Sequence, residues 1–343
     1  MAALTLRHAT LMSEEQTSAE AKDDEGEFLA SVPLFAGIPQ ADLAELSQLL
    51  RRREFAAGQI LWREGEPAPG MVLILDGTVS LSLSLPGERT IEFRRAGRAE
   101  LLGEVPLIDG GTHSATAQAV EPTTVLFLRR GDFAGLVSRH HRTAFAIKRG
   151  IAVVACGRLR TQLATLAASL GEESNGNVGG EIKPLAEDLE FRGPPDSRYV
   201  SRLAAFRGFD SLALWGFLTA GRYAQCPAGR TLVPEGTEPT ACYLTINGAV
   251  EKVIIRGGRR IRVGLAGPGQ AFGYENLIDG RPAPTTATTR ERTLLLVLPL
   301  EAFNRLFYGE TAGSHVFIDV INRDVIASLR QTLRPQARLA TSI

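Results

Sequence analysis

Two stretches of the chain place a glycine, an acid and a run of small residues in the same order. Residues 101–116 read LLGEVPLIDGGTHSAT, and residues 271–288 read AFGYENLIDGRPAPTTAT. This order predicts a short helix and a following loop that face a pocket, because the first turn of a helix has N–H groups without internal acceptors. Such a pocket suits an anion, and small side chains would let a phosphate approach the backbone closely.

The elements that must position these stretches belong to an internal repeat. Phe35 and Phe206 lie 171 positions apart, and so do Glu64 and Glu235. The glycines that open the two stretches lie 170 positions apart. Since several landmarks keep one spacing to within a residue, the sequence predicts two copies of one domain.

Each copy consists of short apolar runs separated by turn residues. Residues 78–85 alternate between apolar residues and serines or threonine, which predicts a half-buried strand. Residues 55–61 and 71–75 predict two further strands, and Asp76-Gly77 predicts a hairpin. Many short strands flanked by helices favour a small β-roll. We therefore predict an α+β protein with two tandem β-rolls of jelly-roll type, each flanked by helices and followed by a long helix.

Both glycine-led stretches resemble the phosphate-binding cassette of the cyclic nucleotide-binding domain family. In that family a Gly-Glu pair opens the short helix, and the glutamate holds the ribose 2′-hydroxyl. An arginine before a small-Ala-Thr run pairs with the cyclic phosphate. The first stretch matches the opening and the close of the cassette and has a histidine at the arginine position. The resemblance implies a ligand site made of Gly103, Glu104, Val105, His113, Ser114 and Ala115.

The second stretch departs further from the cassette. Tyr274 occupies the glutamate position, and Glu275 follows one residue late. Thr285 stands at the arginine position, and the loop is two residues longer than in the first stretch. Threonine hydroxyls donate hydrogen bonds but carry no charge, so a degenerate second site is favoured. The corresponding set of residues is Gly273, Tyr274, Glu275, Thr285 and Thr286.

Two residues of the first stretch leave alternatives open. Glu104 either accepts a ribose hydroxyl or is a surface carboxylate that is favourable near a helix N-terminus. His113 either donates one hydrogen bond to a phosphate or covers a pocket that no longer takes a cyclic nucleotide. In neither case can an imidazole supply the bidentate fork of a guanidinium.

A long helix is predicted after each roll, at residues 142–170 and 314–333. Both carry apolar residues at three- and four-residue spacing, such as Leu159 with Leu163 and Ile321 with Val325. In the family that the cassettes resemble, this helix closes over the base and often forms a dimer seam. The stripe fits equally well a helix that packs only on its own roll, so self-association stays an alternative.

The domain boundaries follow from the repeat and from composition. Residues 28–170 and 198–335 are the two expected cyclic-nucleotide-binding-like domains, with 171–197 as the linker. Residues 1–27 form an expected acidic disordered tail, and residues 336–343 form a second tail.

Composition excludes several classes of function. The 38 basic and 38 acidic residues of the 343-residue chain cancel, so nothing draws it electrostatically to DNA. No apolar run is long enough to span a membrane, and no signal peptide precedes the first domain. The three cysteines are widely spaced, which favours reduced thiols and a cytoplasmic location. No residue pattern indicates a catalytic nucleophile, a metal site or a bound cofactor.

These observations favour a bacterial regulatory protein rather than an enzyme. We expect it to sense cyclic AMP, cyclic GMP or a cyclic dinucleotide, chiefly in the first domain. About ten residues follow Leu333, too few for a helix-turn-helix domain, so the output is expected through a protein partner or through oligomers formed by the long helices. The alternative is a ligand-independent scaffold built from degenerate sensor domains.

Overall fold

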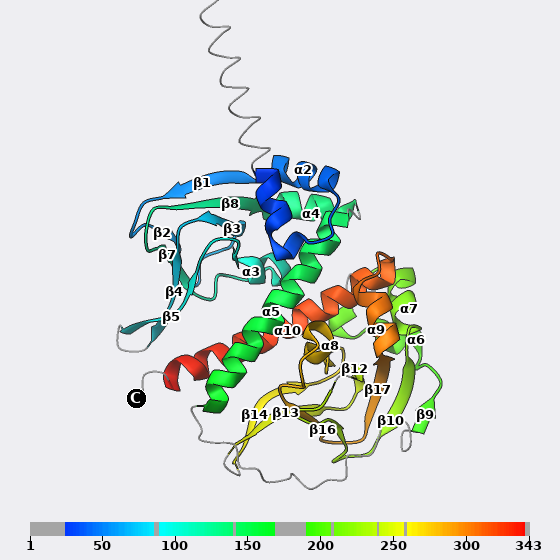
Figure 1. The fold of residues 1–343 in the computed structure, drawn as a ribbon. Helices are drawn as coiled ribbons and strands as arrows, with labels where there is room; N and C mark the ends of the chain where they lie inside the picture. The colour runs from blue at the N-terminus through cyan, green and yellow to red at the C-terminus, as the bar shows by residue number, and fades with distance from the viewer. Residues whose placement is uncertain are drawn as a thin grey trace, which may run out of the picture. The chain divides into compact units, whose positions relative to one another are not determined.

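The chain divides into two compact units, residues 1–150 and 151–343 (Figure 1). The computed structural model describes residues 25–85, 89–139, 142–168, 190–206, 209–238, 240–256 and 259–339. Each unit contains an antiparallel β-roll with helices around it, as the sequence predicts.

The described part of the first unit has two four-stranded sheets with the strand orders β1-β8-β3-β6 and β2-β7-β4-β5. Their strands are β1 (Arg51–Phe55), β2 (Ile60–Trp62), β3 (Gly70–Asp76), β4 (Val79–Leu85), β5 (Arg89–Ala96), β6 (Leu101–Leu102), β7 (Thr116–Ala119) and β8 (Thr123–Arg129). The short helices are η1 (Pro33–Phe35), α2 (Gln40–Leu49), α3 (Glu104–Asp109) and α4 (Arg130–Ser138). Aliphatic and aromatic residues of both sheets form one buried core between them.

The described part of the second unit repeats this plan and adds one edge strand. Its sheets have the orders β15-β12-β17-β10-β9 and β11-β16-β13-β14. The strands are β9 (Glu190–Arg192), β10 (Arg222–Cys226), β11 (Thr231–Val233), β12 (Ala241–Asn247), β13 (Val250–Arg256), β14 (Arg259–Ala266), β15 (Ala271–Phe272), β16 (Thr286–Thr289) and β17 (Thr293–Pro299). The helices are α6 (Ser197–Ser201), η2 (Ala204–Phe206), α7 (Ser211–Leu218), α8 (Glu275–Asp279), α9 (Leu300–Phe307) and α10 (Ala312–Leu339).

The backbone irregularities of the two rolls also repeat. The pairing of β3 with β8 shifts register between Ile74 and Asp76, and that of β12 with β17 shifts between Thr245 and Asn247. These two bulges lie 171 positions apart, so the spacing found in the sequence reflects one local geometry built twice.

The Asp76-Gly77 turn differs from the sequence prediction of a hairpin. It connects β3 to β4, which lie in different sheets. Gly77 has a φ of 88°, and a Cβ there would lie 2.6 Å from the carbonyl oxygen of Pro122. The glycine is therefore required by close packing against the β7–β8 turn as well as by its left-handed backbone. The predicted strand at residues 55–61 is likewise divided, because a turn separates β1 from β2.

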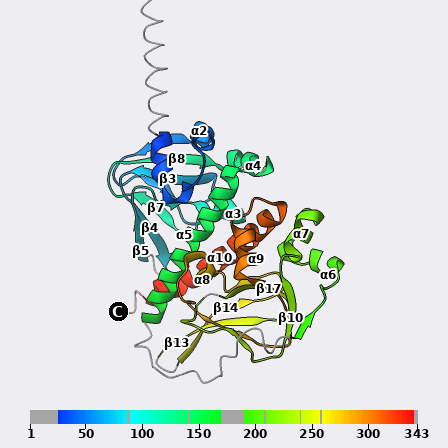
Figure 2. The same cartoon turned by 45° about the vertical axis from the view of Figure 1, so that its right-hand side comes forward.

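The long helices α5 (Arg142–Ala168) and α10 begin near the predicted positions. The apolar stripe of α10 is buried within its own unit, where the helix packs on α7, α9 and β14. Both cartoon views show α9 beside α10 (Figures 1 and 2). The stripe of α5 is buried too, with Leu159 2% and Leu163 4% exposed. In the described structure these stripes contribute to packing within the chain.

Several sequence predictions concern segment boundaries. Residues 190–192 were assigned to the linker and form β9, which pairs with β10. Residues 25–31 are helical, and α10 extends to Leu339. The remainder of the predicted linker up to residue 189, the tail up to residue 24 and residues 340–343 lie outside the described residues.

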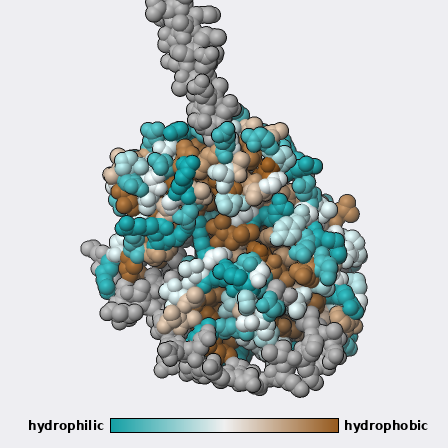
Figure 3. Space-filling model, viewed as in Figure 1, coloured by the Kyte–Doolittle hydropathy of each residue, from teal (hydrophilic) through white to brown (hydrophobic). Residues whose placement is uncertain are grey.

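The face shown in Figure 3 mixes hydrophilic and hydrophobic residues. Among the described residues, no helix is both long enough and apolar enough to cross a bilayer. All three cysteines are buried and unbridged, which confirms the expected free thiols.

Candidate functional site

The first cassette is built around Gly103 at the start of α3. Gly103 has a φ of 77°, and a Cβ at this position would lie 3.2 Å from the carbonyl oxygen of Gly70 and 3.4 Å from Cε1 of His113. Only glycine fits this combination of backbone conformation and close packing. The geometry brings Gly103 and His113 together, as the sequence predicts, although nine residues separate them.

Glu104 is the first residue of α3 and is only 2% exposed. Its position at the N-terminus of the helix favours a carboxylate. The burial argues against the alternative in which Glu104 is an ordinary surface acid. Val105 on α3 and Ser114 in the loop before β7 are half-buried, and Ala115 beside Ser114 is 7% exposed.

His113 is fixed by both its backbone and its ring. Its N–H donates to the carbonyl oxygen of Glu66 at 3.0 Å, and its own carbonyl accepts from the N–H of Gly65 at 2.9 Å. The imidazole stacks on the indole of Trp62, with ring centroids 4.3 Å apart and an angle of 12° between the planes. Trp62 is a residue of this site that the sequence analysis did not identify.

The imidazole of His113 is neutral at physiological pH. Burial lowers its pKa from the ordinary value of 6.5 to about 4; the carboxylate of Glu66 opposes this shift, and the charge of Arg130 adds to it. A neutral imidazole donates one hydrogen bond and accepts another. His113 therefore provides polarity at the arginine position of the cassette without providing charge.

Arg130, at the start of α4, is a second residue that the sequence analysis missed. Its Nη2 donates to the carbonyl oxygens of Pro106 and Ala68, at 2.8 and 3.0 Å. The guanidinium thus ties the cassette helix to the segment before β3. Comparison of the two copies could have identified Arg130, because the equivalent first residue of helix α9 is the apolar Leu300. The basic residue at this place is specific to the first copy.

The second cassette has the same length as the first, which corrects the predicted two-residue insertion. Ala283 exchanges backbone hydrogen bonds with Gly236 and Thr237 just as His113 does with Gly65 and Glu66. Ala283, not Thr285, therefore occupies the arginine position.

Thr286 confirms the corrected alignment. Its hydroxyl accepts from the N–H of Glu235 at 3.0 Å, as that of Thr116 does from Glu64. Thr285 is 7% exposed and corresponds to Ala115. The repeated threonines allowed the sequence to be aligned in two ways, and only the backbone contacts distinguish them.

Tyr274 of the second cassette is bonded to the helix that follows the roll. Its hydroxyl donates to Oδ2 of Asp324 on α10 at 2.6 Å, and the side chain is fully buried. Burial, followed by the charge of Asp324, raises the pKa of Tyr274 well above its usual value. The residue that replaces the expected glutamate therefore attaches the cassette to the helix that follows the roll.

Lys252 of β13 contributes a cation to the same cluster. Its Nζ lies 3.6 Å from Oδ2 of Asp324 and 3.2 Å from Oγ of Ser328, and the residue is 6% exposed. Burial disfavours the ammonium, but Asp324 and Glu275 outweigh it and raise the pKa of Lys252. Burial also raises the pKa of Glu275, against the opposing effect of Lys252. The second cassette thus contains its own charge partner.

Little space remains in the second cassette. The cavity that Lys252, Gly273, Glu275 and Thr285 line has a volume of about 10 Å³, roughly the lower limit for one water molecule. A nucleotide would require Lys252 and its neighbours to move. The predicted degeneracy of this site therefore has a definite structural form, an internal cation held by α10.

A family model for the cyclic nucleotide-binding domain matches residues 52–140 and 224–308. This chain belongs to that family. The matched segments cover most of both rolls, including each cassette. The family therefore accounts for the repeated architecture that the structure shows.

Individual relatives match one domain at a time. A cyclic nucleotide-gated potassium channel of Mesorhizobium japonicum is 35% identical over 112 residues, which are 33% of this chain and 30% of the channel. The cyclic AMP receptor protein of Thermus thermophilus is 32% identical over 107 residues, 31% of this chain and 50% of the receptor. This chain therefore spans half or less of these two relatives.

A solved structure of the Toxoplasma gondii protein kinase A regulatory domain with cyclic AMP aligns with 84% of this chain and 93% of its own. The identity is 17% and the TM-score 0.34. The assignment of the two domains therefore depends on the family match and not on this structural similarity.

Proposed function

We propose that this protein is a regulatory nucleotide sensor whose first domain binds a cyclic nucleotide. The observation that carries the proposal is the arrangement of the first cassette, in which Gly103 packs against His113 and Glu104 is buried at the start of α3. The position of Lys252 on β13 corresponds to Leu81 on β4, since Lys252 pairs with Ala287 and Leu81 with Ala117 at the equivalent places of the two sheets. At this place the first domain has the apolar side chain of Leu81, and the second domain has the ammonium of Lys252.

Binding follows from the chemistry of these groups. Glu104 accepts a hydrogen bond from a ribose hydroxyl, the role that the family resemblance implies. The amides of α3 and the neutral His113 donate to the cyclic phosphate. Since no guanidinium forms two parallel bonds to the phosphate, the affinity is lower than an arginine-containing cassette would give. The bound ligand then favours one arrangement of the helices after the roll, and a protein partner reads that change.

Isothermal titration of the full chain tests the proposal. Cyclic AMP, cyclic GMP and cyclic di-GMP are each titrated into the purified protein and into its Glu104→Gln variant. We expect heat of binding with one of these nucleotides and at least a tenfold loss in the variant. Glu54→Gln is the matched control, because Glu54 is an exposed glutamate on β1 of the same unit and lies outside the cassette.

A ligand-independent scaffold is the second candidate, and the second domain favours it. Ala283 at the arginine position and the Lys252–Asp324 pair leave that cassette filled by protein. If the wild-type chain gives no heat of binding with any of the three nucleotides, the scaffold is favoured for the whole protein.

A further inference from the structure

The imidazole of His113 is buried at the first cassette with its polar atoms unused. Within the described part of the chain, neither ring nitrogen has a hydrogen-bond partner, although the residue is only 4% exposed. The ring stacks on Trp62, and the backbone is held by Gly65 and Glu66. A buried polar group without a partner is costly, and most such groups in proteins are bonded. The two ring nitrogens are therefore available to a group that comes from outside the chain.

Two charges act on this ring from different elements. The carboxylate of Glu66, in the segment between β2 and β3, favours the protonated imidazole. The guanidinium of Arg130, at the start of α4, disfavours it. A further carboxylate, Glu104, begins α3, whose preceding glycine packs against the ring. Since the charges of Glu66 and Arg130 oppose each other, burial decides that the free ring is neutral.

A cyclic phosphate would change this balance. A cyclic phosphodiester carries one negative charge at neutral and mildly acidic pH. An opposite charge within ~4–6 Å favours the charged form of a titratable group. At the arginine position of the cassette, the imidazole lies beside that charge. The bound phosphate should therefore raise the pKa of His113 from about 4 back toward the ordinary value of 6.5.

We propose that the first cassette takes up a proton together with the cyclic phosphate, and that His113 carries this proton. The inference rests on the proposed function and adds its regulation. At neutral pH the ring binds the phosphate as a neutral donor, and in mild acid it binds as the imidazolium, through a charge-assisted hydrogen bond. Because the complex then holds more protons than the free chain, binding strengthens as the pH falls. The sensor responds to a cyclic nucleotide and to acidification jointly.

The test is titration calorimetry of the full chain with cyclic AMP, cyclic GMP and cyclic di-GMP, at about pH 7.5 and about pH 5.5. We expect the nucleotide that binds to do so roughly three- to tenfold more tightly at the lower pH. Acetate and MES buffers differ in their enthalpy of ionisation, so the heat at the lower pH should differ between them. The difference should correspond to more than about half a proton per ligand. Adenosine carries no phosphate, so any heat that it gives should be the same in both buffers.

Two substitutions assign the proton to His113. His113→Gln keeps a hydrogen-bond donor that does not titrate, so its affinity should be equal at the two pH values and its proton uptake should vanish. His113→Arg keeps its charge throughout, so it should also lose the pH dependence while it binds more tightly than the wild type. His315→Gln is the matched control, because His315 is another buried histidine, 9% exposed, on α10 of the second unit. This control should keep the proton uptake of the wild type.

The outcomes separate this inference from the proposed function. Binding to the wild-type chain with equal heats in both buffers would overturn the inference and leave the proposed function standing. Proton uptake that persists in His113→Gln would assign the proton to a carboxylate, Glu104 or Glu66, and would also overturn it. Absence of heat with all three nucleotides at both pH values would overturn the proposed function and the inference with it.

Discussion

Lys252 and Asp324 place opposite charges 3.6 Å apart inside the second domain, on a strand of the roll and on the helix that follows it. Both side chains are less than one-tenth exposed. Tyr274 donates to the same carboxylate from the cassette helix. One carboxylate thus joins a strand of the roll, the cassette and the helix after the roll.

Removal of the ammonium should destabilise the second unit strongly. Lys252→Met leaves Asp324 and Glu275 buried without their cation, and the expected loss is about 3–5 kcal/mol. Urea unfolding of the second unit is measured in the full chain by the fluorescence of Trp215. A Trp62→Phe background leaves Trp215 as the remaining tryptophan. Arg290→Met, at an exposed ion pair, is the control and should change the free energy of unfolding by less than about 1 kcal/mol.

A double-mutant cycle separates the ion pair from packing. Asp324→Asn combined with Lys252→Met should cost clearly less than the sum of the two single variants, because the double variant removes both members of the pair and only Glu275 still lacks the ammonium. Strict additivity of the two costs would show that the two charges do not interact.

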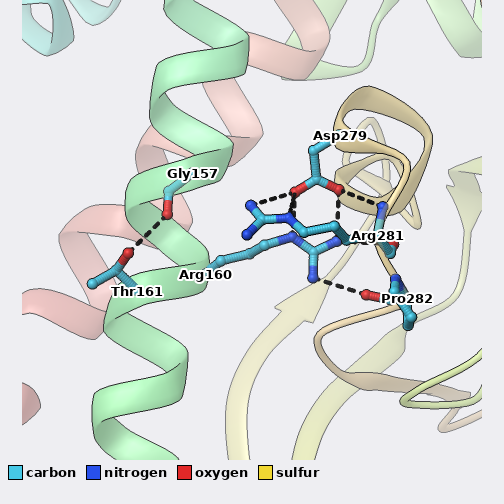
Figure 4. A network of polar contacts seen from close by, with 6 residues as sticks. All are labelled: Gly157, Arg160, Thr161, Asp279, Arg281 and Pro282. Atoms are coloured by element: carbon cyan, nitrogen blue, oxygen red, sulfur yellow. Dashed lines mark hydrogen bonds and ion pairs between the residues drawn. The ribbon is translucent and has the colours of Figure 1, made fainter.

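The two arginines on Asp279 predict a contrast between otherwise similar substitutions. Arg160→Ala removes a nearly buried guanidinium with bonds to a carboxylate and two carbonyls, and should cost roughly 2–4 kcal/mol. Arg281→Ala removes an exposed partner of the same carboxylate and should cost less than about 1 kcal/mol. Hydrogen exchange of α5 between Arg160 and Ala164 should rise in the first variant and stay unchanged in the second. Similar exchange in both variants would show that the bonds of Arg160 to Asp279 and the loop (Figure 4) do not stabilise this part of α5.

His113 predicts a pH dependence of the first unit. Because burial lowers the pKa of His113 to about 4, the unfolded chain takes up a proton near pH 6.5 while the folded chain does not. Stability is therefore full above pH 6.5 and falls toward pH 4, by up to about 3 kcal/mol. The Cε1 proton resonance of His113 should titrate near pH 4, and His113→Gln should flatten this part of the stability profile. A titration midpoint near 6.5 would contradict the buried, neutral imidazole.

A guanidinium at the same position should strengthen the cassette. His113→Arg places a permanent charge beside Trp62, on which a guanidinium can stack. We expect the affinity of the first domain for its cyclic nucleotide to rise at least tenfold, about 1.4 kcal/mol. Ala283→Arg in the second domain is the matched control and should create no site, because Lys252 still fills that cassette. Tight binding in the control variant alone would invert the assignment of the two domains.

The architecture was accessible from sequence because its signals are local and repeated. Turn glycines, short apolar strands and their constant spacing are each set by a few neighbouring residues. The family match and the paired bulges at Ile74 and Thr245 confirm the duplication. The Asp76-Gly77 turn was predicted as a turn but not as a connection between sheets, since the two strands it joins do not pair with each other.

The chemistry of the cassettes was less accessible because it depends on distant residues. Tyr274 meets Asp324 across 50 positions, and Arg160 meets Asp279 across 119. No pattern in the chain links a lysine on one strand to an aspartate on a later helix. The stack of His113 on Trp62, which accompanies its burial, is also a contact between separate segments.

The stoichiometry of cyclic nucleotide binding tests the central claim most directly. The claim is that the first cassette is open to a ligand and the second is filled by Lys252. Calorimetric titration of the intact chain should give one molecule of cyclic nucleotide per chain, with the site lost in Glu104→Gln and kept in Asp324→Asn. Two molecules per chain, or a single site that survives Glu104→Gln and disappears in Asp324→Asn, would contradict it.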